Sequence, residues 1–213
     1  MSGFVRASLA TITVVGIAGV VLRLSGLWER IDAAWQRLTA EDLQRRLFEG
    51  RLGRVYARHY APLATWLYAA YAKGLELGSE DEVLDVACGS GVFLARYARH
   101  VRRIAGLDQS QAMIDQARRE NAERVTAGSA EFVVGDVTAL PWADNTFTVV
   151  TSNDVNCYEA KAPAAVKEMY RVLKPGGRAV VGTDRCEMMQ AAGFRRVSGR
   201  RVMGMYLTTG YKD

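Results

Sequence analysis

The stretch 83–93, VLDVACGSGVF, constrains the fold of this chain more than any other part of its 213 residues. Its apolar start predicts a short strand buried on both faces, which is typical of a parallel sheet covered by helices. Gly89 and Gly91 follow, and glycine allows positive φ and lets a ligand approach bare backbone. A helix is expected over about 92–103. A strand, a glycine turn and a helix in this order predict an α/β sheet with a ligand site at the carboxyl end of the strand.

The glycine turn departs from the dinucleotide-binding fingerprint G-x-G-x-x-G, because position 94 is Leu94 and not a third glycine. A Gly-x-Gly pair alone is also typical of an ordinary tight turn. Three further segments continue the alternation of strands and helices: 104–110 (IAGLDQS), 130–150 (AEFVVGDVTALPWADNTFTVV) and 164–182 (AAVKEMYRVLKPGGRAVVG). The predicted strands end in Asp108 and at Gly135-Asp136, and 174–177 predicts a turn. Since ligands bind at the carboxyl edge of an open α/β sheet, these aspartates predict a site there.

The motifs LDVACGSGVF, GLDQSQAMIDQAR, GDVTALPWADNTFTVV and EMYRVLKPGGRAVV, in this order over 80–182, resemble those of class I S-adenosylmethionine-dependent methyltransferases. The similarity is greatest to the branch that contains ubiquinone/menaquinone and small-molecule methyltransferases. It implies S-adenosyl-L-methionine as the cofactor. It also implies an α/β fold: a Rossmann-like, doubly wound, mostly parallel seven-stranded sheet with an antiparallel C-terminal hairpin, preceded by an N-terminal helical arm.

The resemblance assigns cofactor-binding residues to the strand ends. They are Asp85, Ala87, Gly89, Gly91 and Asn153 around the methionine part; Asp108, Gln109 and Met113 around the ribose and adenosine; and Asp136 and Val137 at the adenine ring. A cationic sulfonium with polar ends needs carboxylates and backbone groups at fixed points around an apolar slot, so these residue types fit. The alternative is that the aspartates only cap turns. Three of them at successive strand ends favour a binding site.

Methyl transfer from a sulfonium requires alignment and exclusion of water, and a general base only if the acceptor must lose a proton. The candidates for such a base are Asp154, Tyr158 and His59. In related enzymes a tyrosine-bearing element precedes the catalytic core and covers the site. Tyr56 and Tyr60 are therefore the candidates for closing the substrate site.

The cysteines, Cys88, Cys157 and Cys186, are far apart without C-x-x-C spacing, so neither a disulfide framework nor a metal site is expected. The formal net charge is +5, but the arginines are spread along the chain without a nucleic-acid recognition motif. No nucleic-acid partner is expected. The oligomeric state is not predicted.

The segment 7–22 contains no charged residue, and Arg6 and Arg23 flank it. It is shorter than the roughly 20 residues that a helix needs to span a bilayer, although neighbouring apolar residues could extend it. We expect 1–24 to be a membrane anchor, single-pass or monotopic, with the catalytic domain on the cytoplasmic face. The alternative is an element that packs on the catalytic domain. A cleavable export signal is not expected, since no small-x-small site precedes Leu24.

The expected domains are the apolar segment 1–24, a helical arm and active-site cover over 25–77, and the S-adenosylmethionine-binding domain over 78–213. The arm is rich in arginine and tryptophan, which favours either an anionic membrane surface or packing on the protein itself. The first hypothesis is a membrane-associated methyltransferase of a lipophilic acceptor, either a quinone precursor or a phospholipid amine. The alternatives are a soluble methyltransferase of a small polar metabolite and a non-catalytic, cofactor-binding partner subunit.

Overall fold

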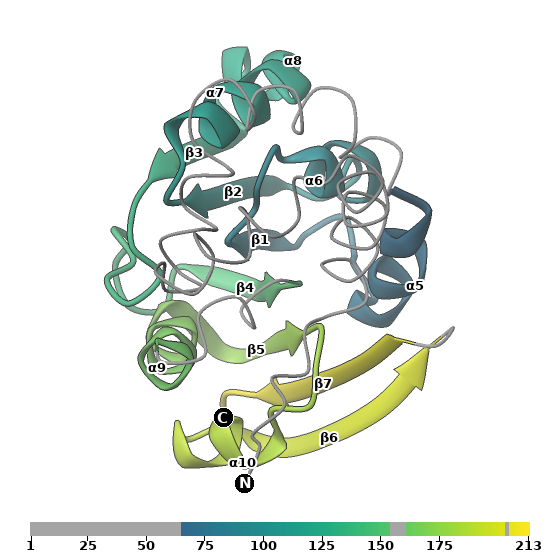
Figure 1. Ribbon diagram of the computed structural model, residues 1–213, viewed down its shortest axis with the longest axis vertical. Coiled ribbons are helices and arrows are strands. Elements are labelled where there is room, and N and C mark those ends of the chain that lie inside the picture. The colour runs from purple at the N-terminus through teal and green to yellow at the C-terminus, as the bar shows by residue number, and fades with distance from the viewer. Residues whose placement is uncertain (1–64, 154–160, 203–204) are drawn as a thin grey trace, which may run out of the picture. The chain divides into compact units, whose positions relative to one another are not determined.

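The computed structural model describes residues 65–153, 161–202 and 205–213, which form an α/β domain (Figure 1). The elements in chain order are α5 (Thr65–Leu75), β1 (Glu82–Val86), α6 (Val92–Tyr97), β2 (Arg103–Asp108), α7 (Gln111–Glu120), α8 (Ala122–Thr126), β3 (Ala130–Val134), β4 (Phe147–Ser152), α9 (Ala162–Val172), β5 (Leu173–Val181), α10 (Cys186–Ala191), β6 (Arg195–Val202) and β7 (Met205–Tyr211). The predicted segment 7–22 lies outside the described residues. Within the described ranges, no helix is both long enough and apolar enough to cross a membrane.

The seven strands form one sheet in the order β3-β2-β1-β4-β5-β7-β6. Strands β1 to β5 are parallel, whereas β7 runs antiparallel to both β5 and β6. The predicted fold class and C-terminal hairpin are therefore confirmed. The chain builds outward from β1 to β3 and then returns to place β4 on the other side of β1. This reversal of strand order creates a switch point between β1 and β4, where open α/β sheets bind ligands.

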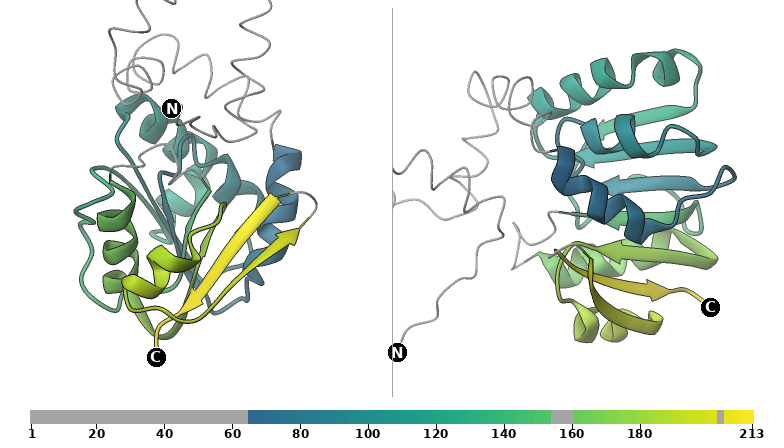
Figure 2. Two further views of the ribbon diagram at one scale, coloured as in Figure 1. Left: turned by 60° about the horizontal axis from the view of Figure 1, so that its bottom comes forward. Right: turned by 90° about the vertical axis from the view of Figure 1, so that its right-hand side faces the viewer.

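Helices cover both faces of the sheet (Figure 2). Leu84 and Val86 of β1 pack into one core, together with buried residues of α9 and α10. Val83 points to the other core, which α5, α6 and α7 complete. This alternation explains why Val83, Leu84 and Val86 of β1 are all apolar, since both faces of a parallel sheet are buried.

Helix α5 is held on the sheet by a buried tyrosine. The side chain of Tyr71 is fully buried, and its hydroxyl donates to the Val180 carbonyl at 2.8 Å. The same hydroxyl also hydrogen-bonds to the Thr151 hydroxyl. Because Thr151 belongs to β4 and Val180 to β5, these contacts fix α5 over the strands that follow the switch point.

The helix expected over 92–103 is wrong in its second half, because α6 ends at Tyr97 and β2 begins at Arg103. One arginine stabilises the turn between them. The Arg124 guanidinium donates to four carbonyls of this turn, those of Ala98 (2.9 Å), Arg99 (3.2 Å), Val101 (2.9 Å) and Arg102 (3.2 Å). These carbonyls would otherwise lack partners at the end of a helix, so the turn replaces the last predicted helical turns.

The turn predicted over 174–177 is a bulge inside β5. Pairing with β4 passes from Phe147–Leu173 to Val149–Arg178, so 174–177 stand opposite Thr148 alone. Gly176 has φ 79, a conformation that glycine adopts without steric cost. The strand therefore begins at Leu173, before the predicted turn, and continues beyond it.

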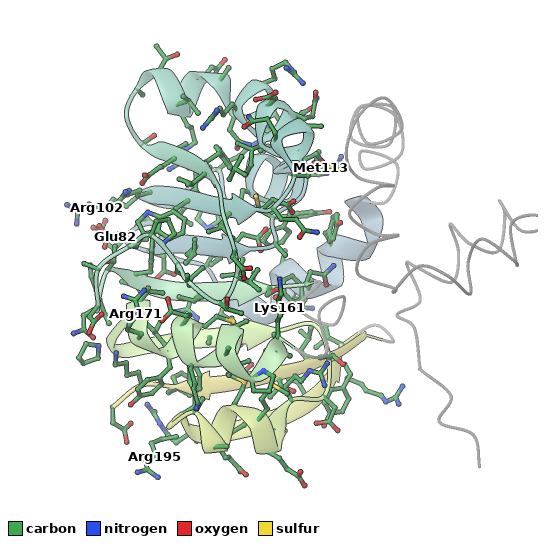
Figure 3. The ribbon with its side chains drawn as sticks, turned by 60° about the vertical axis from the view of Figure 1, so that its left-hand side comes forward. Glu82, Arg102, Met113, Lys161, Arg171 and Arg195 are labelled. Atoms are coloured by element: carbon green, nitrogen blue, oxygen red, sulfur yellow. The ribbon has the colours of Figure 1, made fainter. Side chains whose placement is uncertain are left out.

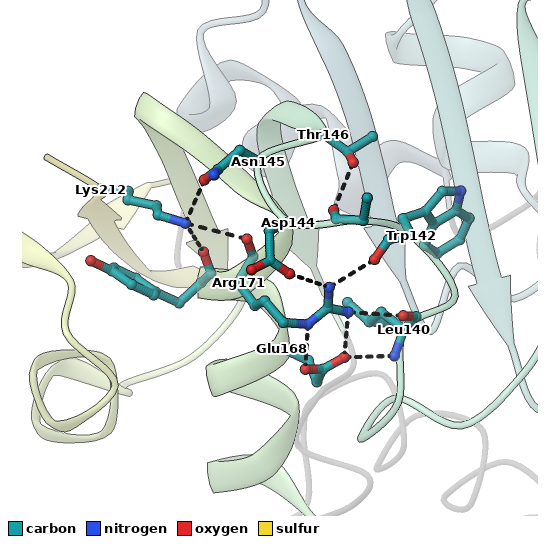
Figure 4. Close-up of polar contacts among 10 residues, drawn as sticks. Leu140, Trp142, Asp144, Asn145, Thr146, Glu168, Arg171 and Lys212 are labelled. Atoms are coloured by element: carbon teal, nitrogen blue, oxygen red, sulfur yellow. Dashed lines mark hydrogen bonds and ion pairs between the residues drawn. The ribbon is translucent and has the colours of Figure 1, made fainter.

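A side-chain network ties the 140–146 loop to α9 (Figure 4). The Arg171 guanidinium binds both carboxylate oxygens of Glu168 at 2.7 Å, and it donates to the Leu140 carbonyl at 2.9 Å and the Trp142 carbonyl at 2.8 Å. Hydrogen bonds from Arg171 lower the pKa of Glu168. Glu168 therefore contributes stability above its ordinary pKa, and the contribution is lost as the pH decreases through the lowered pKa of the folded protein.

We expect Arg171→Leu to lower the free energy of unfolding by about 2–3 kcal/mol, because Glu168 and the loop carbonyls lose a charged donor. Urea unfolding near neutral pH measures the change. The control is Lys167→Leu, at an exposed position of the same helix, which should cost less than about 0.5 kcal/mol. Equal losses in both variants would contradict a specific stabilising function for the network.

Candidate cofactor site

The loop after β1 contains three residues with left-handed backbone. Ala87, Gly89 and Gly91 have φ values of 62, 53 and 69. Alanine rarely adopts this conformation, and such strain is concentrated at functional sites. A Cβ on Gly89 would meet no atom of the described residues within 4 Å, so its backbone borders open space in this part of the protein. The predicted positive φ values of the two glycines are confirmed.

Asp108, the last residue of β2, connects this loop to the next helix. Its Oδ2 accepts from the Gly89 backbone N–H and its Oδ1 from the Ser110 backbone N–H, both at 2.9 Å. A carboxylate has about four acceptor sites, so each oxygen keeps capacity for a ligand hydroxyl. Burial raises the pKa of Asp108 above its ordinary value. The carboxyl group is thus fixed at the strand end, with acceptor positions for a diol.

A surface hollow lies beside Asp108. Its lining residues are Ala87, Gln109, Gly135, Asp136, Val137 and Lys161. The structure therefore brings together four of the predicted residues, from loops that follow β1, β2 and β3. Lys161 and Met113 lie at one edge of the sheet, away from Glu82 at the start of β1 (Figure 3). The hollow is at the carboxyl edge, where the site is expected.

Asp136 is fixed by partners on both of its oxygens. Oδ1 accepts from the Thr138 backbone N–H at 2.9 Å and from the Thr138 hydroxyl at 2.8 Å. Oδ2 accepts from the Lys161 ammonium at 3.1 Å. The Thr138 backbone hydrogen bond is the main cause that lowers the pKa of Asp136, and Lys161 adds to it. Asp136 is therefore an oriented, ionised acceptor at the rim of the hollow.

The remaining predicted cofactor residues do not line this hollow. Asp85 is buried within β1, and Met113 is buried within α7. Gly91 lies against α7, where its Cβ would come within 2.8 Å of the Ala117 Cβ. Asn153 follows β4, and its buried Oδ1 has no hydrogen-bond partner in the described part of the protein. An unsatisfied buried acceptor at a strand end is a candidate ligand contact.

The candidate bases and substrate residues, His59, Asp154, Tyr158, Tyr56 and Tyr60, lie outside the described residues and remain predictions. Among the described residues, no cluster of histidine, cysteine, aspartate and glutamate could hold a metal ion.

Two residues of the hollow were not predicted. Gly135 donates its N–H to the Asp108 carbonyl at 3.0 Å. Lys161 precedes α9, and a lysine before a helix carries no sequence signal for a cofactor contact. Gly135 directly precedes Asp136 in the third motif, and this position is a signal by which it could have been found.

Comparison with known proteins agrees with this geometry. Residues 84–181 match the family described as methyltransferase domain. The demethylmenaquinone methyltransferase of Symbiobacterium thermophilum is 38% identical over 101 residues, which cover 46% of this chain and 40% of that protein. The malonyl-[acyl-carrier protein] O-methyltransferase of Serratia marcescens is 29% identical over 129 residues, 60% of this chain and 48% of that protein. The first curated relatives are matched over 19% to 48% of their length, so this chain spans half of it or less.

A solved structure shows the same fold. The TehB-like SAM-dependent methyltransferase of Corynebacterium glutamicum superposes with a TM-score of 0.57 and 21% identity, over 74% of this chain and 98% of that chain. The strand order and the hollow at the carboxyl edge are those of an open α/β domain with a candidate ligand site at its switch point. The family match makes the similarity specific: residues 84–181 resemble the methyltransferase domain of class I S-adenosylmethionine-dependent methyltransferases. The cofactor of this family is S-adenosyl-L-methionine.

The described residues fit this cofactor. Asp108 offers acceptors for the ribose hydroxyls, and Asp136 offers an acceptor for the exocyclic amine of adenine. The open space beside Gly89 and the unsatisfied Asn153 Oδ1 suit the methionine part.

Proposed function

We propose that this chain is a S-adenosylmethionine-dependent methyltransferase that acts on a lipophilic acceptor, either a quinone precursor or a phospholipid amine. The proposal of methyl transfer depends mainly on one observation, the positions of two carboxylates at the ends of the neighbouring strands β2 and β3. Asp108 contacts the glycine turn, and Asp136 lines the hollow. The two carboxylates supply the acceptors that the two ends of an adenosine need.

The proposed mechanism depends on alignment. When bound, S-adenosylmethionine supplies a methyl group that its sulfonium has already activated. Asp108 would orient the ribose, and the bare backbone at Gly89 would leave room for the methionine part. Holding the reacting groups in line and excluding water then contributes most of the rate. If the acceptor must lose a proton, Asp154, Tyr158 and His59 are the proposed candidates for the base.

Three observations support a lipophilic acceptor. The demethylmenaquinone methyltransferase is among the relatives, and its name refers to a quinone-type acceptor. The segment 7–22 is uncharged, which suits a membrane anchor. The connection from β5 to α10 is only 182–185, so this connection places little chain over the carboxyl edge. These observations support the further proposal that the domain acts at the cytoplasmic face of a membrane and that Tyr56 and Tyr60 cover the substrate.

The test is transfer of a labelled methyl group from S-adenosylmethionine, by the full chain, into a lipid extract and, separately, into an aqueous metabolite pool. We expect label in the organic phase and its loss in Asp85→Ala. Asp115→Asn, a carboxylate on α7 that accepts from Gln111 on the same helix, is the control and should keep full transfer. Label confined to the aqueous pool would contradict the lipophilic acceptor. Cofactor binding without transfer to either pool would instead indicate a non-catalytic subunit.

Deleting 1–24 tests the anchor. We expect the shortened chain to leave the membrane fraction while its domain keeps the thermal stability of the full chain, because an anchor contributes no packing to the domain. Loss of stability without a change of fraction would support the soluble alternative, in which this segment packs on the protein.

A further inference from the structure

Lys161 lies immediately before α9 and lines the same hollow as Ala87, Gln109 and Asp136. Its ammonium contacts Asp136 Oδ2 at 3.1 Å, and the two side chains are 32% and 47% exposed. Ion pairs this exposed contribute little to folding stability, since water screens both charges. We therefore expect Lys161 to affect the binding of a ligand in the hollow more than the stability of the fold.

The geometry leaves one hydrogen-bond acceptor position on Asp136 for a ligand. Thr138 occupies Oδ1 with two hydrogen bonds, from its backbone N–H and from its hydroxyl. Oδ2 accepts from Lys161 alone among the described residues, and a carboxylate oxygen can accept two hydrogen bonds. One acceptor position thus remains on Oδ2, beside the ammonium. Thr138 and Lys161 together fix the plane of the carboxylate, so this position has a defined direction.

We propose that Lys161 is a positioning residue for the adenine end of the cofactor site. It holds Asp136 Oδ2 so that the free acceptor position faces the exocyclic amine of adenine, and its aliphatic stem forms part of the wall of the hollow. Without Lys161, only Thr138 restrains the Asp136 carboxylate, through Oδ1, and Oδ2 must be reoriented when the cofactor binds. That reorientation has an entropic cost, which a preorganised site avoids. The proposal rests on the assignment of Asp136 to adenine.

The experiment compares Lys161→Ala, Lys161→Gln and Lys161→Arg with the unchanged chain by calorimetric titration of S-adenosylmethionine. We expect Lys161→Ala and Lys161→Gln to weaken binding by about threefold to tenfold, as the loss of one charge-assisted contact implies. Lys161→Arg should restore most of the affinity. The unfolding temperature without cofactor should not change, and the KM for the cofactor should rise while kcat stays constant. Lys167→Ala, an exposed lysine of the same helix, is the matched control.

The Asp136→Ala variant separates this inference from the site assignment on which it rests. If Asp136→Ala leaves cofactor affinity unchanged, the adenine assignment is wrong. If Asp136→Ala weakens binding and Lys161→Ala does not, the positioning function alone is overturned. Equal weakening by Lys161→Ala and Lys167→Ala would also overturn it, because the cause would then be general charge. The double variant should be no weaker than Asp136→Ala alone, since Lys161 acts through that carboxylate.

Discussion

Asp108→Ala is expected to weaken S-adenosylmethionine binding by about 100-fold or more, because hydrogen bonds to a charged acceptor contribute roughly 1.5–3 kcal/mol each and a ribose offers two hydroxyls. The same carboxylate holds the Gly89 and Ser110 backbone N–H groups at 2.9 Å. Its loss therefore removes the ligand contact and also releases the glycine turn. Calorimetric titration of the cofactor measures the affinity, and circular dichroism establishes that the variant is folded.

The pH dependence of binding is a second measure of the Asp108 function. Burial raises the pKa of Asp108 in the free protein, so protonation begins above the ordinary aspartate pKa of about 3.9. Only the ionised carboxylate accepts hydrogen bonds from both ribose hydroxyls, hence affinity should decrease as the pH is lowered through this raised pKa. Asp115→Asn should bind the cofactor as the unchanged chain does. Wild-type affinity in Asp108→Ala, or affinity independent of pH, would contradict the assignment of Asp108 to the ribose.

The parts of the site that could be predicted from sequence are those that adjacent residues determine. A buried strand followed closely by Gly89 and Gly91 predicts a tight turn. Glycine adopts the positive φ values that such a turn requires, and both residues have them. Asp108 and Asp136 were predictable for the same reason, since Asp108 ends the apolar strand β2 and Asp136 lies two residues beyond the end of β3.

The features that could not be predicted depend on contacts between distant residues. Lys161 reaches Asp136 across 25 positions of the chain, and only the packing of α9 on the sheet brings them together. Arg124 ends α6 through carbonyls more than 20 positions earlier. Local propensity favours a helix that continues beyond Tyr97. The helix ends earlier because its last carbonyls find partners in the Arg124 side chain, and such partners determine where a helix ends. Neither contact leaves a local pattern in the sequence.

Gly91→Ala is expected to destabilise the domain by about 2–4 kcal/mol, because the new methyl group combines a strained backbone with overpacking. Gly91 has φ 69, and its Cβ would lie 2.8 Å from the Ala117 Cβ and 3.0 Å from the Ala117 Cα. The Asn121 amide also donates to the Gly91 carbonyl at 3.2 Å, so α6 and α7 are in direct contact here. Relief of the clash requires the loop after β1 to move away from α7, and this movement would change the positions of the candidate cofactor-binding residues in that loop.

Gly128→Ala is the matched control for Gly91→Ala. Gly128 has φ 70, but its Cβ would meet no atom within 4 Å among the residues that the structure describes, so the substitution adds backbone strain without a clash there. We expect it to cost about 1–2 kcal/mol and to leave cofactor binding unchanged, because Gly128 lies in the turn between α8 and β3. Urea unfolding and cofactor titration of both variants separate strain from packing. If the two variants lose equal stability and both bind the cofactor normally, then contact between the turn and α7 does not determine the geometry of the site.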